Sequence, residues 1–135
     1  GGKDYWVVKV DASGNKLWDK RFGGSGADVC NAALILSDGG FLLAGHSASG
    51  AEGDRTEASR GDEDFWVVKI DANGNKIWDK RFGGGNIDVC HSVVPTLDGS
   101  YLLAGHSTSG MTPWTFSNKG FTVLVESCVS LIIFF

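Results

Sequence analysis

Residues 64–84 read DFWVVKIDANGNKIWDKRFGG, and residues 4–24 read DYWVVKVDASGNKLWDKRFGG. The two stretches lie at a constant offset, and aligning residues 4–50 with residues 64–110 gives roughly 30 identities in 47 positions without a gap. Most substitutions between the copies keep volume and apolarity, as at Tyr5 and Phe65. A unit of about 60 residues therefore recurs in this chain, and we expect both copies to pack in the same way.

Three of the segments in each period are typical of short strands. Residues 41–47 are apolar and follow an Asp-Gly-Gly turn, and residues 64–71 are rich in β-branched and aromatic side chains. Residues 71–75 supply turn chemistry, because Gly74 can take positive φ and the Asn and Asp side chains can bond to local backbone. The sequence therefore predicts a hairpin that continues into a strand over residues 76–82.

The fourth segment, residues 88–96, ends at another Asp-Gly turn. Its Pro95 has no N–H to donate to a neighbouring strand, so we expect this segment at a sheet edge, as the outermost strand. Four short antiparallel strands per period without a helix fit a propeller blade better than a leucine-rich repeat or an α-solenoid. The predicted fold class is all-β, with antiparallel four-stranded blades of an incomplete β-propeller.

The run from Gly40 to Gly84 resembles the blades of quinoprotein-like propellers, which place an inner strand, an LDxxTGxxxW hairpin and a Gly turn in this order. Residues 1–110 look still more similar to tandem repeats of large secreted or surface proteins from bacteria that use a Por-type secretion system. Those repeats carry DYWVVKLDxxGNKLWDKTFGG and DGGYLLAG blocks. The resemblance implies an extracellular or cell-surface location, but it implies no particular activity, because one fold hosts many functions.

On this phasing the chain divides into four parts. Residues 1–40 form the outer strands of a preceding blade, residues 41–100 one complete blade with an exposed loop at 51–63, and residues 101–110 the inner strand of a following blade. Residues 111–135 form a divergent apolar tail, which we interpret as a strand completing the sheet or as a reading-frame artefact. Since a propeller needs four to eight blades, we expect contact with neighbouring repeats of the same array or self-association.

The ends of the chain and its composition limit the possible partners. No signal peptide precedes the first repeat, and we interpret the chain as a fragment. The apolar tail, as a helix, would reach only about 22 Å of a hydrocarbon core of about 30 Å, so we expect no membrane span. A net charge of −4 without a basic stripe makes nucleic acid a poor partner. Cys30, Cys90 and Cys128 lack CxxC spacing and indicate small buried side chains rather than disulfides or zinc ligands.

The loop at residues 51–63 carries two candidate features. Arg60, Gly61 and Asp62 spell an adhesion tripeptide, which the first copy of the repeat lacks. The acidic residues of the loop suggest a weak possibility of calcium binding, although their spacing matches no known calcium loop and a solvated loop is the favoured interpretation. These acidic residues are Glu52, Asp54, Glu57, Asp62, Glu63 and Asp64.

A second group of candidate residues lies at the end of the predicted inner strand in each copy of the repeat. His46 and Ser47, and their counterparts His106 and Ser107, are predicted to be polar positions of an inner channel. His91 replaces Asn31 and lies outside the repeated pattern. The sequence has no nucleophile elbow, metal-protease motif or phosphate loop, so we expect no enzymatic activity and no catalytic, cofactor or metal residues.

Three functions are compatible with the sequence. The favoured one is a structural or adhesive module that contacts a protein or glycan ligand through its loops. A carbohydrate-binding propeller module is an alternative, because the repeated tryptophans could stack on sugars, although blade-to-blade packing is the preferred interpretation of these rings. A fragment of a quinoprotein-like dehydrogenase propeller is the other alternative.

Overall fold

The computed structural model describes residues 2–109 and 121–123, and all regular structure in these residues is β. The predicted all-β class is confirmed, and eight of the strands pair in antiparallel fashion. The strands are β1 (Tyr5–Val10), β2 (Lys16–Phe22), β3 (Asp28–Ile35), β4 (Phe41–Ser47), β5 (Asp64–Ile70), β6 (Lys76–Phe82), β7 (Asp88–Pro95), β8 (Tyr101–Ser107) and β9 (Phe121–Val123).

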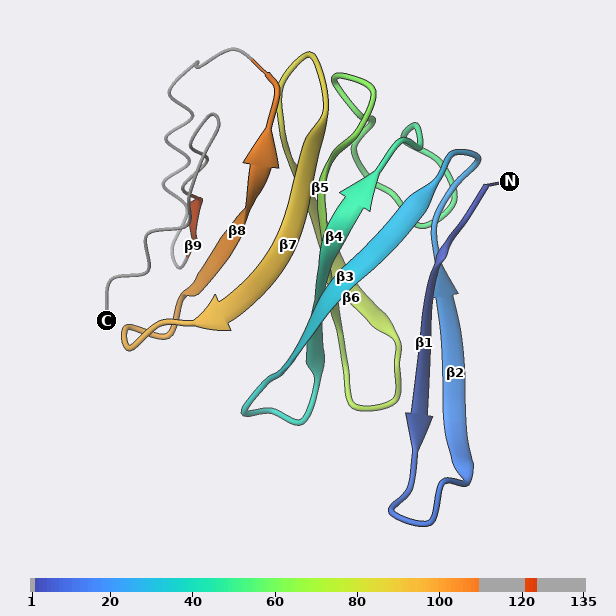
Figure 1. Cartoon of the computed structure of the whole chain (residues 1–135). Coiled ribbons are helices and arrows are strands. Elements are labelled where there is room, and N and C mark those ends of the chain that lie inside the picture. The colour runs from blue at the N-terminus through green and yellow to red at the C-terminus, as the bar shows by residue number, and fades with distance from the viewer. Residues whose placement is uncertain (1, 110–120, 124–135) are drawn as a thin grey trace.

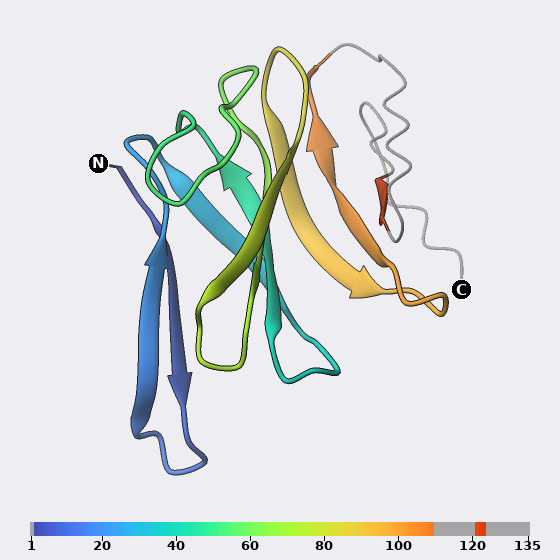
Figure 2. The ribbon, with the colours of Figure 1, turned by 180° about the vertical axis from the view of Figure 1, so that it is seen from behind.

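The strands form three sheets that follow one another in chain order (Figures 1 and 2). The β1–β2 hairpin forms the first sheet, and the second has the strand order β3-β4-β5-β6. The third sheet has the order β7-β8-β9, with β9 parallel to β8. Both views show the four-stranded sheet between the β1–β2 hairpin and the β7–β8 pair.

The grouping of strands differs from the sequence-based prediction by one strand. Residues 88–96 were expected to be the outermost strand of a sheet beginning at residue 41, but β7 pairs with β8, and β3 takes the place beside β4. Residues 41–47 are therefore not an innermost edge strand, because β4 lies between β3 and β5. Pro95 does lie in an edge strand, as expected from its missing N–H.

The lengths of the connections explain this difference. A tight turn joins β3 to β4 and so keeps them in one sheet; in this turn the Leu36 N–H donates to the Gly40 carbonyl oxygen, and the Gly39 N–H donates to the Leu36 carbonyl oxygen. The chain instead changes sheet at the short glycine-rich link between β6 and β7. The long connection from β4 to β5 returns to the same sheet, where the two strands pair over seven residues.

The predicted turn at residues 71–75 is confirmed. Gly74 has a φ of 82°, which an L-residue adopts only with strain. The Asp71 carboxylate accepts hydrogen bonds from the backbone N–H groups of Asn73 and Asn75 and from the Asn75 side-chain amide. The side chain therefore holds this hairpin loop closed, and the same bonds to Asp11 hold the equivalent loop of the first copy.

Two apolar clusters join the sheets. One cluster includes Tyr5 and Phe22 of the hairpin with Trp66 and Val68 of β5, and the Tyr5 and Trp66 rings lie 4.7 Å apart. The other joins the four-stranded sheet to β7 and β8 and includes Phe65. Because consecutive residues of a strand point to opposite faces, β5 contributes to both clusters and is covered on both sides.

The loop at residues 51–63 is less exposed than expected. Arg55 is only 4% exposed, and its Nη1 donates to Ser47 Oγ at 2.8 Å and to the Ser49 carbonyl oxygen. The Arg55 guanidinium also lies 5.5 Å from the centre of the Trp66 ring. The other residues of the loop are exposed or intermediate, so Arg55 is the exception to the expected exposed loop, and this buried cation anchors the middle of the loop to the sheet.

The tail beyond residue 110 lies largely outside the described residues. Residues 121–123 form β9, whose backbone pairs with Tyr101–Leu103 of β8. Across residues 2–109 and 121–123 there is no helix of a length and apolarity that would span a bilayer.

Candidate functional site

A β-bulge in each copy of the repeat aims a polar side chain toward a histidine. The register of β3 with β4 shifts between Cys30 and Ala32, and that of β7 with β8 shifts between Cys90 and Ser92. The residue left at each bulge is Asn31 or His91. Bulges commonly redirect a side chain beside functional sites, and here each one faces the histidine of the neighbouring strand.

In the first copy, Asn31 fixes the orientation of His46. The Asn31 amide donates to the Cys90 carbonyl oxygen at 2.7 Å and lies 3.3 Å from His46 Nδ1. Because the amide is the donor, Nδ1 accepts and the proton of the neutral ring resides on Nε2. Nε2 in turn lies 3.7 Å from Glu63 Oε2. Asn31 therefore links β7 to β4 and sets the tautomer of His46.

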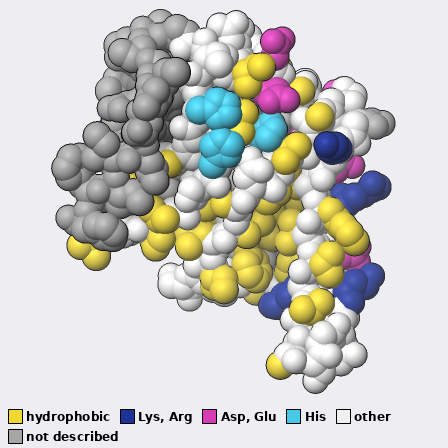
Figure 3. All heavy atoms as spheres, viewed as in Figure 1, with side chains coloured by type: hydrophobic (Ala, Val, Ile, Leu, Met, Phe, Trp, Pro, Cys, Tyr) yellow, Lys and Arg dark blue, Asp and Glu magenta, His cyan; other side chains and the backbone are white. Residues whose placement is uncertain are grey.

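In the second copy, two histidines occupy the corresponding positions. His91 Nε2 lies 2.9 Å from His106 Nδ1, and the rings stack with centroids 5.0 Å apart. One ring must donate and the other accept, so this bond requires at least one neutral ring. The three histidines of the chain gather in one patch with acidic side chains beside it (Figure 3).

We call Asn31, His46, Glu63, His91 and His106 the histidine cluster. Burial lowers the pKa of His46 below its ordinary value, with the nearby imidazoles of His91 and His106 adding to this effect and Glu63 opposing it. His46 is therefore neutral at pH 7, and its contact with Glu63 is not a full ion pair. The imidazole nitrogens and the Asn31 amide allow the cluster to donate and accept hydrogen bonds.

Ser47 and Ser107 do not join the histidine cluster. Neighbouring strand residues point to opposite faces, so Ser47 lies on the other side of β4 from His46. Ser47 is fully buried, donates through Oγ to Asp28 Oδ1 and receives a hydrogen bond from the Ser49 N–H. Ser107 Oγ receives the equivalent bond from Ser109 N–H at 3.1 Å. Both serines thus hold the chain after a strand, and their role as polar positions of an inner channel stays a prediction.

The Arg60-Gly61-Asp62 tripeptide is partly packed against the protein. Arg60 and Asp62 are exposed, but a Cβ on Gly61 would lie 2.3 Å from the Asn86 carbonyl oxygen. The Arg60 N–H donates to Asp64 Oδ2 at 2.6 Å. Gly61 therefore lets two chain segments approach closely, which gives the glycine of this tripeptide a structural reason.

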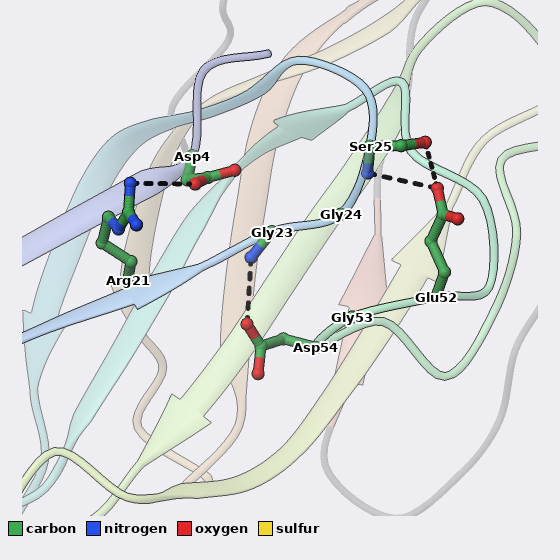
Figure 4. A pocket seen from close by; sticks show the side chains of 8 residues that line it. All are labelled: Asp4, Arg21, Gly23, Gly24, Ser25, Glu52, Gly53 and Asp54. Atoms are coloured by element: carbon green, nitrogen blue, oxygen red, sulfur yellow. Dashed lines mark hydrogen bonds and ion pairs between the residues drawn. The ribbon is translucent and has the colours of Figure 1, made fainter. Parts of the chain in front are cut away.

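A pocket of about 420 Å³ lies where the β2–β3 connection meets the loop at residues 51–63 (Figure 4). Asp4 and Arg21 approach to 3.6 Å, Asp54 accepts from the Gly23 N–H, and Glu52 accepts from the Ser25 N–H. Its remaining lining residues are Gly24 and Gly53. Glu52 and Asp54 hold the loop and Asp4 faces Arg21, so each carboxylate that lines the pocket already has a partner.

The possibility of calcium binding gains no geometric support. Within the described part of the chain, no group of three or more His, Cys, Asp or Glu side chains is arranged to hold a metal ion. Asp54 and Glu52 accept backbone N–H groups, and Asp64 lies 3.2 Å from Arg81 Nη1. The acidic residues of the loop are thus dispersed among separate partners.

The described cysteines are free thiols. Burial raises the pKa of Cys90 to about 11 and also raises that of Cys30. Cys90 is fully buried, and its thiol donates to the Ser92 carbonyl oxygen. The interpretation of these two residues as small buried side chains is confirmed for Cys90, whereas Cys30 is half-buried. Cys128 lies outside the described residues.

His91 is the cluster member that sequence reasoning set aside. His91 differs in type from Asn31, yet both side chains occupy the same bulge and face the same histidine position. A bulge is invisible to a period-two pattern because it adds a residue to one strand only. The sequence did contain a signal, since Asn31 and His91 are polar residues at equivalent positions of the two copies, but it was not used.

Comparisons with known proteins give limited information. No family model matches the chain. Among curated proteins, the chain is similar to the regulatory protein FlaEY of Caulobacter vibrioides, with 26% identity over 111 residues. This match covers 79% of the chain but 11% of FlaEY, so the chain spans a small part of that relative.

Proposed function

We propose that this chain is a non-catalytic repeat module of an extracellular or cell-surface protein. In this proposal its sheets are blades of a β-propeller array, and its exposed loops contact a protein or glycan ligand. A single observation carries the proposal, namely that one contact between sheets is made twice. A Cβ on Gly45 would lie 2.7 Å from the Tyr5 hydroxyl, and a Cβ on Gly105 would lie 2.8 Å from Phe65 Cζ. The second and the third sheet therefore each receive a ring of the preceding sheet in the same place.

The polar residues of the repeat support a structural role. Asp28 accepts from the Gly24 N–H at 2.9 Å and from Ser49 Oγ at 2.8 Å. Asp88 accepts from Gly84 N–H at 2.7 Å and, again at 2.8 Å, from a serine hydroxyl. The same hydrogen bonds therefore hold the chain at equivalent positions of both copies. A stacked array needs such repeated contacts to keep each connection between sheets in one conformation.

The surroundings of Trp18 and Trp66 argue against the alternative of a carbohydrate-binding module. The Trp18 indole donates to the Ala72 carbonyl oxygen at 3.2 Å and packs edge-on against Phe41. Trp66 is fully buried beneath Tyr5. These two rings pack between sheets and are poorly placed to stack on a sugar, whereas Trp6 is exposed.

The length of the curated match is compatible with the proposal. A segment similar to 11% of a longer protein is what we expect of a module within an array. The word "regulatory" in the name of FlaEY specifies no ligand, so we transfer no binding partner from it.

Insertion of one more repeat tests the proposed array. A second copy of residues 28–87 placed after Ile87 should add four strands and one further contact between sheets, and should raise the free energy of unfolding in a single transition. The matched control carries Gly→Val at the inserted equivalent of Gly45, which blocks the ring contact. A separate, weaker transition for the unmodified insert would contradict the proposal.

Cell fractionation and ligand screening test the rest of the proposal. An antibody to the chain should detect the protein in the surface or secreted fraction, and detection in the cytoplasm alone would contradict the proposed location. Immobilised chain should retain a protein or glycan, and replacing the exposed Arg60 and Asp62 by serine should weaken that retention if the loop makes the contact.

A further inference from the structure

We infer that copies of this chain bind one another edge to edge, with the β1–β2 hairpin of one copy completing the sheet that begins with β7 and β8 in another. The hairpin is equivalent in sequence to β5–β6, and the β7–β8 pair is equivalent to β3–β4. In the four-stranded sheet these two halves are joined through β4 and β5. The β7–β8 pair and the β1–β2 hairpin are therefore the two halves of a second four-stranded sheet, which two copies of the chain can form together. This inference depends on the equivalence of the repeats, on the strand edges that lack a partner in the described residues and on the exposed apolar face of β1, and not on where the protein acts.

The pairing of β4 with β5 specifies the register of the proposed contact. Gly45 lies opposite Trp66, and Leu42 lies opposite Lys69. The equivalent register between two copies places Gly105 of one copy opposite Trp6 of the other. In the same register, Leu102 lies opposite Lys9. Seven antiparallel pairs would form, as they do between β4 and β5. A docked edge strand gains its affinity from these backbone hydrogen bonds.

The free edges needed for this contact are present in the described residues. Across residues 2–109 and 121–123, β1 pairs with β2 alone, so its other edge has no strand beside it. The corresponding edge of β8 pairs with β9 over Tyr101–Leu103, which leaves Ala104–Ser107 without a strand partner in the same residues. Docking exchanges three parallel pairs for seven antiparallel ones, and antiparallel pairing is slightly more stable per residue.

The side chains of β1 supply an apolar face for the same contact. Trp6 is 66% exposed, whereas its equivalent Trp66 is fully buried beneath the Tyr5 ring. In the proposed register, Trp6 of the second copy lies beside Gly105, which the Phe65 ring already approaches. Phe65 would therefore cover Trp6 of the second copy as Tyr5 covers Trp66.

The neighbouring residues show that this burial is specific to one face of the hairpin. The exposed residues Val8 and Val10 correspond to Val68 and Ile70, which are fully buried. Leu17 is different, because it and its equivalent Ile77 are 58% and 54% exposed. Hydrophobic side chains are visible on the surface of this hairpin in Figure 3. The proposal thus predicts which exposed apolar residues become buried and which do not.

The contact is head-to-tail, because each copy has one donor hairpin and one acceptor edge. Such contacts close into rings when the rotation between copies allows it, and otherwise form chains. We therefore expect species heavier than one copy in sedimentation or light-scattering measurements on the full chain, with a monomer at low concentration.

Matched surface substitutions test the apolar part of the contact. Trp6→Asp should raise the dissociation constant at least about tenfold, because an interface tryptophan is commonly among the dominant contacts. Leu17→Asp adds the same charge at a similarly exposed site and should leave association unchanged. Circular dichroism checks that both variants keep their β-structure. A full-length chain that stays monomeric at every concentration, or equal effects of the two substitutions, would overturn the inference.

Cross-linking tests the register. In a Cys128→Ser background, a copy carrying Leu102→Cys is mixed with a differently tagged copy carrying Lys9→Cys, and a short bis-maleimide should join the two tags. Val8→Cys replaces Lys9→Cys in the control, which should not cross-link, because adjacent strand residues point to opposite faces. Equal cross-linking in both mixtures, or none in either, would refute this register and with it the inference.

Discussion

Trp6 and Trp66 are equivalent residues in nearly identical strands, so replacing each by alanine separates the effect of burial from that of residue type. Trp66 is fully buried, its ring centre lies 4.7 Å from that of Tyr5, and its Nε1 donates to Asp79 Oδ2 at 3.1 Å. Truncating such a ring in a core costs about 3–5 kcal/mol. Trp6→Ala, at a site 66% exposed, should change the free energy of unfolding by less than about 0.5 kcal/mol.

The two variants are compared with the wild type by chemical unfolding followed by far-UV circular dichroism. Low protein concentration keeps any contribution of self-association out of the comparison. Trp66→Phe is an intermediate variant, and we expect it to cost less than Trp66→Ala, because Asp79 keeps its hydrogen bond from the Thr56 N–H. Similar losses at Trp6 and Trp66 would show that the hairpin does not cover β5, and the described stacking of sheets would be wrong.

Three further results are expected. Burial lowers the pKa of His46, so the stability that its neutral form contributes is present above about pH 6.5 and is lost as pH falls through the folded-state pKa. Thermal melts should therefore show a melting temperature that decreases as pH falls in this range. His46→Asn should make that decrease smaller. The pKa of Cys90 is about 11 in the fold, so stability should fall as pH rises from 9 towards 11, by about 2 to 3 kcal/mol, and Cys90→Ala should remove that part. Arg55→Ala should speed proteolysis of the loop at residues 51–63, as measured by mass spectrometry, since the buried guanidinium holds Ser47 and Ser49; an unchanged cleavage rate would contradict this anchoring role.

Local sequence signals predicted the strands well because turn chemistry and strand composition are local properties. The hairpin at residues 71–75 depends on Asp71 and Gly74, both of which were identified from the sequence. Assignment of strands to sheets depends instead on contacts between distant residues. The apolar run at residues 42–45 indicates a strand that is buried on both faces. Burial of the two faces does not determine which strands lie at its two edges, so the sequence left the neighbours of β4 open.

The buried arginine of the loop could not be predicted from composition. Residues 51–63 are rich in charged and small side chains, which is typical of solvated loops. Arg55 is an exception because Ser47, Ser49 and Ser59 supply acceptors at one end of the sheet, and Trp66 supplies the face of a ring. Only the folded chain brings these partners together, since they come from β4, β5 and the loop itself.

The two copies differ where the structure permits a difference. Asp28 and Asp88 hold equivalent connections, and Gly45 and Gly105 each receive a ring, so neither pair can change without loss of a contact that both copies make. The bulge position has no such constraint, since Asn31 and His91 both reach the histidine of the adjacent strand by a single hydrogen bond. A repeat that keeps its packing residues and varies its bulge residue can alter the chemistry of one polar patch without altering the fold. The histidine cluster is therefore the part of this surface where a function could differ from one repeat to the next.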